Sequence, residues 1–186
     1  MTRLRRSSRA VAALSLAVLL TYCADSAPIT GVAQAPRLAT AAAQPALVVC
    51  DNAQTKSVSK IIGPRGGQLT VAGSTIEIPA GAVGTPTEFT LSVPASHFLE
   101  VDISAAGASH YAFARPALIT LGYARCQDPT LDQAELSAWW IDTETKELLQ
   151  EMGGVRNHRA KAVSFPTDHL SGYTIAMSVR SHDDEQ

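Results

Sequence analysis

The sequence predicts an all-β fold, an antiparallel β-sandwich. The evidence is concentrated in residues 61–93, where alternating apolar and polar stretches are separated by turn residues. Thr75–Ile78 and Thr87–Val93 place apolar side chains at every second position, which is the period of a half-buried strand. Gly66-Gly67 and Ala72-Gly73-Ser74 supply tight connections, because glycine adopts positive φ without steric cost. A shorter strand, Gln68–Val71, follows the first of these turns, and three strands in so short a stretch favour an antiparallel sheet.

Residues 1–22 are expected to form a secretory signal peptide. Four arginines precede an apolar run, Ala10–Leu20, that is interrupted only by Ser15. This run is much shorter than the ~20 residues that a membrane span requires, and the basic residues before it argue against a buried core helix. The protein is therefore expected to be exported to the cell envelope.

Cys23 follows the signal in a segment, Leu20-Thr21-Tyr22-Cys23, that resembles the bacterial lipobox. The resemblance implies that Cys23 is lipidated, becomes the new N-terminus and anchors the protein in a membrane. Tyr22 departs from the motif, because a small residue normally precedes the cysteine. The alternative is ordinary cleavage near Ala24 or Ala27, which would leave a soluble secreted or periplasmic protein.

Residues 23–46 are expected to be a flexible tether, since they are rich in Ala, Pro, Thr and Gln and show little periodicity. An early edge strand within this segment is the alternative. Removing the signal takes away four of the 15 basic residues and none of the 17 acidic ones, which leaves a net charge of −6. This acidic balance disfavours binding to nucleic acid through phosphate contacts.

The folded domain is expected over residues 47–180, followed by a disordered tail at 181–186. Its first strand is Leu47–Cys50, and Cys126 is the only other cysteine in the domain. Two cysteines in an exported chain predict a disulfide, here one that ties the first strand to Leu118–Arg125. Closing so long a loop should stabilise the fold by about 4 kcal/mol.

The remaining strands follow from the same alternation. We expect a break at Arg115-Pro116, because proline cannot donate to a ladder, and one helical turn within Pro129–Leu136. The expected strands are Leu99–Ile103, Tyr111–Phe113, Ala117–Tyr123, Ser137–Asp142, Leu148–Met152, Ala162–Phe165 and Gly172–Val179.

Trp139 and Trp140 are adjacent within an expected strand, so they should face opposite sides of the sheet. One should enter the core, and the other should be partly exposed. An exposed tryptophan can form a binding surface for a glycan or an envelope protein, although cover by a neighbouring loop is the simpler reading.

Three segments together resemble the opening of the ZU-five domain, a β-sandwich module found in tight-junction scaffolds, netrin receptors and ankyrins. They are Gly66-Gly67-Gln68-Leu69, Ile76–Ala82 and Thr87–Val93. His169–Tyr173 is similar to a segment near the end of ZU-five-like lipoproteins and exported proteins of bacteria. The resemblance implies a non-enzymatic interaction or structural module without a cofactor, and it names no partner.

A self-cleaving domain is the alternative function. Some death-domain relatives with this fold cut their own backbone at a His-Phe-Ser segment, and His169-Leu170-Ser171 matches it except at Leu170. The Ser171 hydroxyl would attack the Leu170 carbonyl carbon while His169 accepts its proton, and water would then open the resulting ester. The same residues can equally form a turn with satisfied backbone groups.

Other catalytic and metal chemistry is not predicted. The histidines show no ligand-like pairing with one another or with the cysteines, and no Gly-x-Ser-x-Gly elbow or phosphate-binding glycine loop occurs. The five histidines are His97, His110, His158, His169 and His182.

Overall fold

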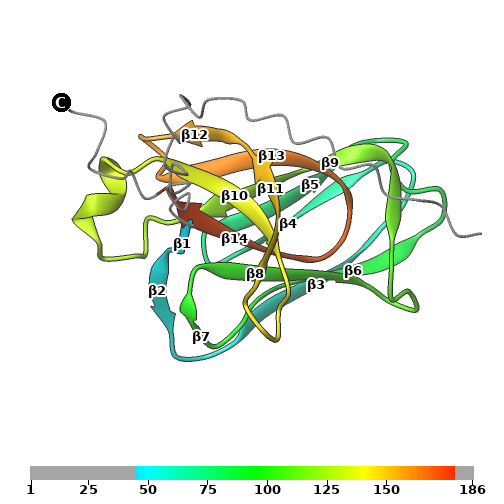
Figure 1. Cartoon of the computed structure of the whole chain (residues 1–186). Coiled ribbons are helices and arrows are strands. Elements are labelled where there is room, and N and C mark those ends of the chain that lie inside the picture. Colours follow the sequence, from blue (N-terminus) through cyan, green and yellow to red (C-terminus); the bar gives the residue numbers. More distant parts are fainter. Residues whose placement is uncertain (1–44, 179–186) are drawn as a thin grey trace, which may run out of the picture. The chain divides into compact units, whose positions relative to one another are not determined.

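A computed structural model describes residues 45–178 and confirms the all-β fold, because antiparallel strands form nearly all of its regular structure (Figure 1). The predictions for the signal peptide, for Cys23, for most of the tether and for the tail at 181–186 lie outside the described residues. The first described strand begins at Ala46, beside the predicted start of the domain.

The larger of two main sheets, sheet A, has seven strands. Six of them follow the order β11-β10-β14-β8-β6-β3, and β1 pairs with the second half of β14, whose first half pairs with β8. The strands are β1 (Ala46–Leu47), β3 (Lys56–Ile62), β6 (Thr87–Val93), β8 (Glu100–Ala105), β10 (Leu136–Ile141), β11 (Leu148–Gly153) and β14 (Gly172–Met177).

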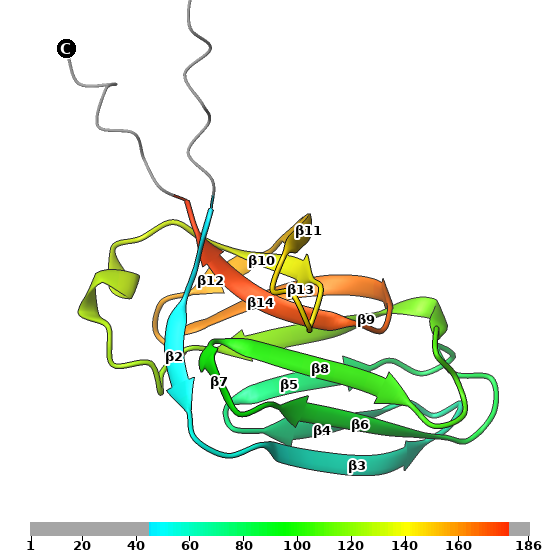
Figure 2. The same ribbon diagram turned by 60° about the horizontal axis from the view of Figure 1, so that its bottom comes forward.

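Sheet B faces sheet A and has five strands in the order β12-β13-β9-β5-β4 (Figure 2). A separate two-stranded ribbon, β2–β7, lies at one end of the sandwich. The strands of sheet B are β4 (Gly67–Val71), β5 (Ser74–Ile78), β9 (Ala112–Gly122), β12 (Val155–Asn157) and β13 (Ala162–His169). The ribbon consists of β2 (Val49–Asn52) and β7 (Ser96–Phe98).

The core lies between the two sheets, where the predicted alternation places the apolar side chains. Ile76 and Ile78 in β5 are buried, whereas Glu77 between them is exposed. Phe89 and Leu91 in β6 are likewise buried. They form one hydrophobic cluster with residues from the neighbouring strands of both sheets, among them Ile103, Ile119, Phe165, Tyr173 and Ile175.

The predicted turns use the residues expected of them. Gly66 has a φ of 74° and donates its N–H to the Gly63 carbonyl at 2.9 Å, which reverses the chain before β4. Ala72 and Gly73, with φ values of 48° and 84°, form the two-residue loop between β4 and β5. The helical turn predicted within Pro129–Leu136 is the 3₁₀ helix η1 (Pro129–Asp132).

The predicted break at Arg115-Pro116 is wrong, because β9 runs through both residues. The register between β9 and β13 shifts between Thr167 and His169, so Pro116 lies in the stretch of β9 that the shift leaves without assigned partners. Proline is tolerated there because no ladder bond requires its N–H.

The predicted end of a strand at Phe165 is also wrong, because β13 continues to His169 through Pro166. On its far side, β13 pairs with β12 only as far as Ser164. Beyond that residue β13 has an open edge, on which the absence of a proline N–H breaks no bond.

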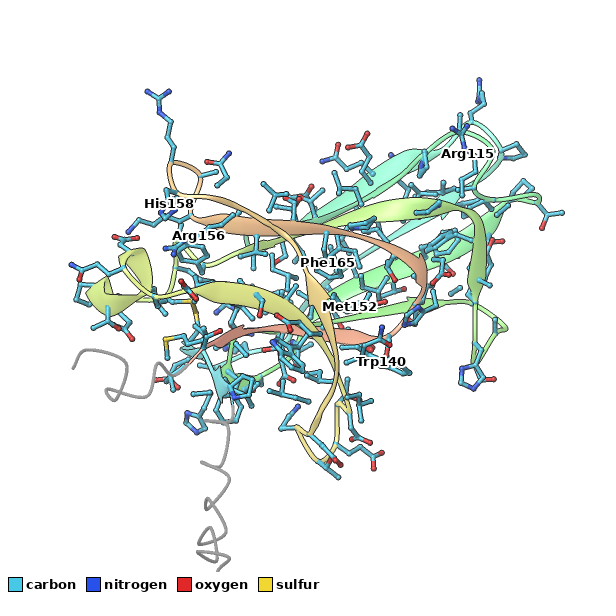
Figure 3. All side chains as sticks on the ribbon, turned by 45° about the horizontal axis from the view of Figure 1, so that its top comes forward. Arg115, Trp140, Met152, Arg156, His158 and Phe165 are labelled. Carbon is cyan, nitrogen blue, oxygen red and sulfur yellow. A yellow bond between two sulfur atoms is a disulfide. The ribbon has the colours of Figure 1, made fainter. Side chains whose placement is uncertain are left out.

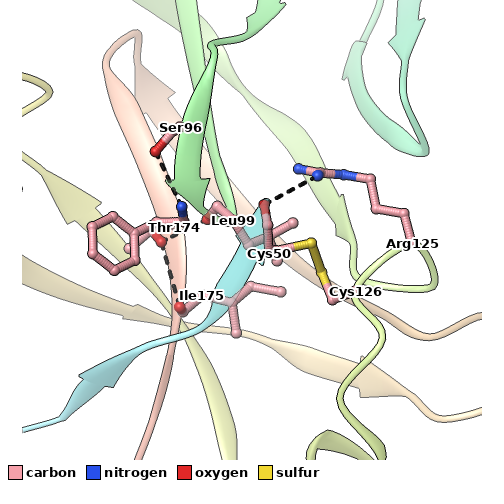
Figure 4. Close-up of a disulfide and its surroundings, with 8 residues drawn as sticks. Cys50, Ser96, Leu99, Arg125, Cys126, Thr174 and Ile175 are labelled. Carbon is pink, nitrogen blue, oxygen red and sulfur yellow. Dashed lines mark hydrogen bonds between the residues drawn. A yellow bond between two sulfur atoms is a disulfide. The ribbon is translucent and has the colours of Figure 1, made fainter. Parts of the chain in front are cut away.

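The disulfide between Cys50 and Cys126 is present, with the two Cα atoms 4.8 Å apart (Figure 4). Its predicted attachment needs correction, since Cys50 lies in β2 of the ribbon and Cys126 lies beyond the end of β9. The bond therefore ties the ribbon to the loop between β9 and η1. The pairing of the N-terminal segment with sheet A is made by β1, which precedes Cys50.

Candidate functional site

One end of the sandwich contains a cleft with a volume of about 650 Å³, which we call the end cleft. Four segments line it: the last residues of β8, the β8–β9 loop, the end of β10 with the loop that follows, and the crossover from β13 to β14. These segments are Asp102–Ala105, Ala108–Ala112, Trp140–Glu144 and His169–Gly172, and Leu149 of β11 completes the lining.

The crossover exists because β13 belongs to sheet B and β14 to sheet A. Leu170 and Ser171 therefore carry the chain from one sheet to the other. The Leu170 N–H donates to the Tyr111 carbonyl at 3.2 Å, and the Ser171 carbonyl accepts from the Ile103 N–H at 3.1 Å. Backbone hydrogen bonds on both sides thus fix the segment that sequence analysis selected for its chemistry.

The His169 imidazole lies between a carboxylate and an indole. Its Nδ1 is 3.0 Å from an Asp168 carboxylate oxygen, and its ring centroid is 5.0 Å from that of Trp140. Its Nε2 is buried and has no hydrogen-bond partner in the described part of the chain. The hydrogen bond with His169 is the largest cause that lowers the pKa of Asp168 below its usual range, so this carboxylate stays ionised beside the ring.

The backbone of His169 is held by buried hydroxyls. The Tyr173 phenol donates to the His169 carbonyl at 2.7 Å, and the Thr167 hydroxyl reaches the same oxygen at 3.1 Å. Burial raises the pKa of Tyr173 to about 12, so the phenol remains a donor at neutral pH. The position of His169 is therefore determined by the core beneath it.

Ser171 lies in the same cleft but does not pair with His169. Within residues 45–178, no hydrogen bond joins the Ser171 hydroxyl to the imidazole. The residues from His169 to Gly172 are also absent from the positions with positive φ in the described chain. The structure thus brings together the two residues proposed for self-cleavage without the contact that proton transfer between them requires.

The two tryptophans face opposite sides of sheet A, as the sequence predicts. Trp140 lies opposite Tyr173, packs against the core and lines the end cleft (Figure 3). Trp139 lies opposite Thr174 on the other face and donates its indole N–H to the Ser137 hydroxyl at 3.0 Å. Both side chains are half-buried. Only Trp140 lines the cleft, so it is the tryptophan that a ligand in the cleft could contact.

A buried ion pair holds the loop that forms one wall of the cleft. The Lys146 ammonium, in the loop between β10 and β11, donates to both carboxylate oxygens of Glu100 at 2.8 and 2.7 Å and to the Thr143 carbonyl at 2.6 Å. Glu100 is only 1% exposed. Sequence analysis missed this pair because the spacing of the two residues carries no signal that they meet.

Asp102, in β8, adds a carboxyl group to the lining of the cleft. Burial raises the pKa of its carboxyl group above the usual range, and the negative charge of Glu100 raises it further. His110 and Tyr111 of the β8–β9 loop also line the cleft. An indole face beside carboxylate and imidazole groups can stack against a ring and bond to hydroxyl or amine groups of a ligand.

Within the described part of the chain, no group of three His, Cys, Asp or Glu side chains is placed to hold a metal ion. Between residues 45 and 178, no helix has the length and apolar character needed to cross a membrane. No protein-family model matches this chain, and no curated protein matches it either. The fold and the cleft therefore carry the functional argument.

Proposed function

We propose that this protein is an exported, lipid-anchored, non-enzymatic binding module of the cell envelope, built on a ZU-five-like β-sandwich. The observation that carries this proposal is the end cleft, in which Trp140 meets polar groups from four separate segments. Loops at one end of a rigid sandwich are a common location for binding sites. The disulfide supports export, because such bonds persist in oxidising compartments.

The course of the chain suits a module anchored at its N-terminus. β14 begins at Gly172 in the cleft and ends at Met177 beside Ala46 of β1. The cleft is therefore about one strand length, roughly 17 Å, from the point where the chain enters the sandwich. An anchor on Cys23 would join the chain at the opposite end of β14 from the cleft, so the cleft would remain open to a glycan or protein of the envelope.

The anchor is tested by the intact mass of the protein expressed with its own signal in a Gram-negative host. We expect acyl mass on Cys23 and recovery in the membrane fraction, both lost in Cys23→Ala. A mature protein that begins near Ala24 or Ala27 without acyl mass would refute the anchor. It would leave the cleft proposal to be judged on binding alone.

The cleft is tested by binding to arrays of envelope glycans and envelope proteins. We expect Trp140→Phe and His110→Ala to weaken binding, because both residues line the cleft. Trp139→Phe is the matched control, since Trp139 lies on the opposite face of the same strand. If all three variants bind as the parent does, the cleft is not the site.

The proposal also requires the backbone to stay intact. Self-cleavage between Leu170 and Ser171 is the rival function, favoured by the presence of His169 and Ser171 in one cleft. We expect a single full-length species on a denaturing gel, with the same mass in Ser171→Ala apart from the substitution. A C-terminal fragment that begins at Ser171, and that Ser171→Ala abolishes, would make the domain an autoprotease.

A further inference from the structure

Arg125, next to the disulfide, carries a charge that the structure leaves uncompensated. Two nitrogen atoms of its guanidinium, Nε and Nη2, are buried and have no hydrogen-bond partner among residues 45–178. Nη1 makes only a long bond of 3.4 Å to the Cys50 carbonyl (Figure 4). Burial lowers the pKa of Arg125 from its usual range, but a guanidinium remains charged at neutral pH. Buried donors without acceptors are costly, so this arrangement requires an explanation.

The unpaired atoms form one edge of the guanidinium. The N–H bonds of Nε and Nη2 are parallel, and together they form a fork that donates to two oxygens of a phosphate or carboxylate. Arg125 lines a pocket of about 420 Å³ together with residues 49–51 and 126–128. Nε and Nη2 are buried in this structure, so a ligand in the pocket could bind this edge only after the flexible side chain rotates toward the pocket.

Two carboxylates line the same pocket, and no ion pair joins either of them to Arg125. Asp51 lies 2.6 Å from the Nδ1 atom of His97. Asp128 accepts from the backbone N–H and the hydroxyl of Thr130, and these bonds lower the pKa of its carboxyl group. A dianion would be repelled by both carboxylates, whereas a monoanion that also carries an ammonium group matches the whole pocket.

The pocket lies near the point where the chain enters the sandwich. β2, which supplies Val49, Cys50 and Asp51, starts two residues after the end of β1. The apolar side chain of Val49 lines the pocket and is 60% exposed. If Cys23 is lipidated, as proposed above, the anchor is connected to the domain at this end.

We propose that the Arg125 pocket binds a phosphoethanolamine headgroup of a membrane lipid, with the phosphodiester on the Arg125 fork and the ammonium group beside Asp51 and Asp128. The location at a membrane rests on the proposed lipid anchor. The chemistry of the pocket is independent of that anchor, because it follows from the unpaired guanidinium edge and the two carboxylates.

The test titrates the full chain, carrying Cys23→Ser so that it is not lipidated, with soluble glycerophosphoethanolamine in a calorimeter. We expect saturable binding, weakened about tenfold or more in Arg125→Gln and also weakened in Arg125→Lys, which keeps the charge but loses the fork. Arg115→Gln is the matched control, because Arg115 donates to the Ala80 carbonyl away from the pocket. Absence of saturable binding, or equal binding by Arg125→Gln, would overturn the proposal.

Comparison ligands separate the two charges of the headgroup. Asp51→Asn with Asp128→Asn should weaken binding of glycerophosphoethanolamine and strengthen binding of glycerophosphoglycerol, which has no ammonium group. Inorganic phosphate and ethanolamine, tested singly, should each bind more weakly than the zwitterion. A preference for inorganic phosphate would overturn the zwitterion assignment.

Flotation with phosphatidylethanolamine vesicles tests the membrane source. We expect the unlipidated chain to float with these vesicles and Arg125→Gln to remain unbound. Binding of the soluble compound without flotation would overturn the lipid assignment in favour of a free phosphoethanolamine ligand. Thermal unfolding of Arg125→Gln verifies that this variant folds. Acylation of Cys23 and binding in the end cleft are measured in separate experiments, so each proposal can fail on its own.

Discussion

At the scale of single residues, Lys146 is a side chain whose loss the fold should tolerate poorly. It is the partner of Glu100, a carboxylate with almost no exposed surface. Lys146→Ala should lower the free energy of unfolding by about 2 kcal/mol, because it leaves a buried charge unpaired. Urea denaturation at pH 7 measures the change.

The control is Lys161→Ala, which removes an ion pair with Asp132 whose side chains are 45% and 48% exposed. Exposed pairs contribute little, so we expect a change within about 0.5 kcal/mol. Equal effects of the two substitutions would show that Glu100 is not held by Lys146.

Asp102 should give the domain a pH dependence of its own. Burial raises its folded pKa above the ordinary value of 3.8, so the folded protein binds the proton more tightly than the unfolded chain. The stability that this provides is present at low pH and is lost as the pH rises through the folded pKa. Asp128, Asp142 and Asp168 have lowered pKa values and act in the opposite direction.

Asp102→Asn isolates this contribution, because asparagine does not titrate. We expect the variant to gain stability relative to the parent as the pH rises from 3 to 7, measured by urea denaturation at each pH. A difference between the two proteins that stays constant with pH would contradict the raised pKa.

The sequence predicted which face of a strand each side chain occupies better than it predicted which residues of other strands that side chain contacts. The opposite orientations of Trp139 and Trp140 follow from the period of a strand. The contact between Trp140 and His169 does not, since the two residues come from strands in different sheets. No local pattern encodes which strands lie side by side, so the composition of the end cleft was beyond sequence reasoning.

At the scale of elements, strands with a clear apolar face were predictable, whereas the edge strands β3 and β12 were not. The predicted strand Thr87–Val93 has the same bounds as β6, which pairs on both sides. β3 was missed because its first five residues, Lys56–Lys60, contain one apolar side chain among two lysines and two serines. They therefore show little contrast between an apolar and a polar face. Such lysine-rich edges discourage pairing with other chains, so their weak pattern has a physical cause.

The turn before β4 provides a prediction at this scale. Gly66 has a positive φ, and a Cβ atom there would collide with the Ile78 carbonyl. Gly66→Ala should therefore cost about 1–3 kcal/mol of unfolding free energy. Gly84→Ala is the matched control, because no atom lies within 4 Å of its added Cβ and its φ is not positive.

We expect Gly84→Ala to change stability by no more than about 0.5 kcal/mol, measured by chemical denaturation beside Gly66→Ala. If Gly66→Ala is as stable as the parent, the turn does not require glycine. The resemblance of Gly66-Gly67-Gln68-Leu69 to the ZU-five opening would then have no conformational basis at this position.

At the scale of the whole molecule, the disulfide connects parts that share no sheet. Cys50 belongs to the ribbon, and Cys126 belongs to the loop after β9. Sequence reasoning predicted the bond from the number of cysteines and from the expected export. It could not predict the ribbon, because β2 and β7 are short and their register is irregular.

Replacing both cysteines, Cys50→Ala with Cys126→Ala, should lower the free energy of unfolding by about 4 kcal/mol, because the bond closes a loop between residues 76 apart in sequence. Denaturation of the oxidised parent, the reduced parent and the double variant measures this loss, and the last two should agree. Binding in the end cleft should persist, since the cleft is lined by other segments. A cleft that loses its ligand while the variant stays folded would show that the ribbon end and the cleft are coupled through the sandwich.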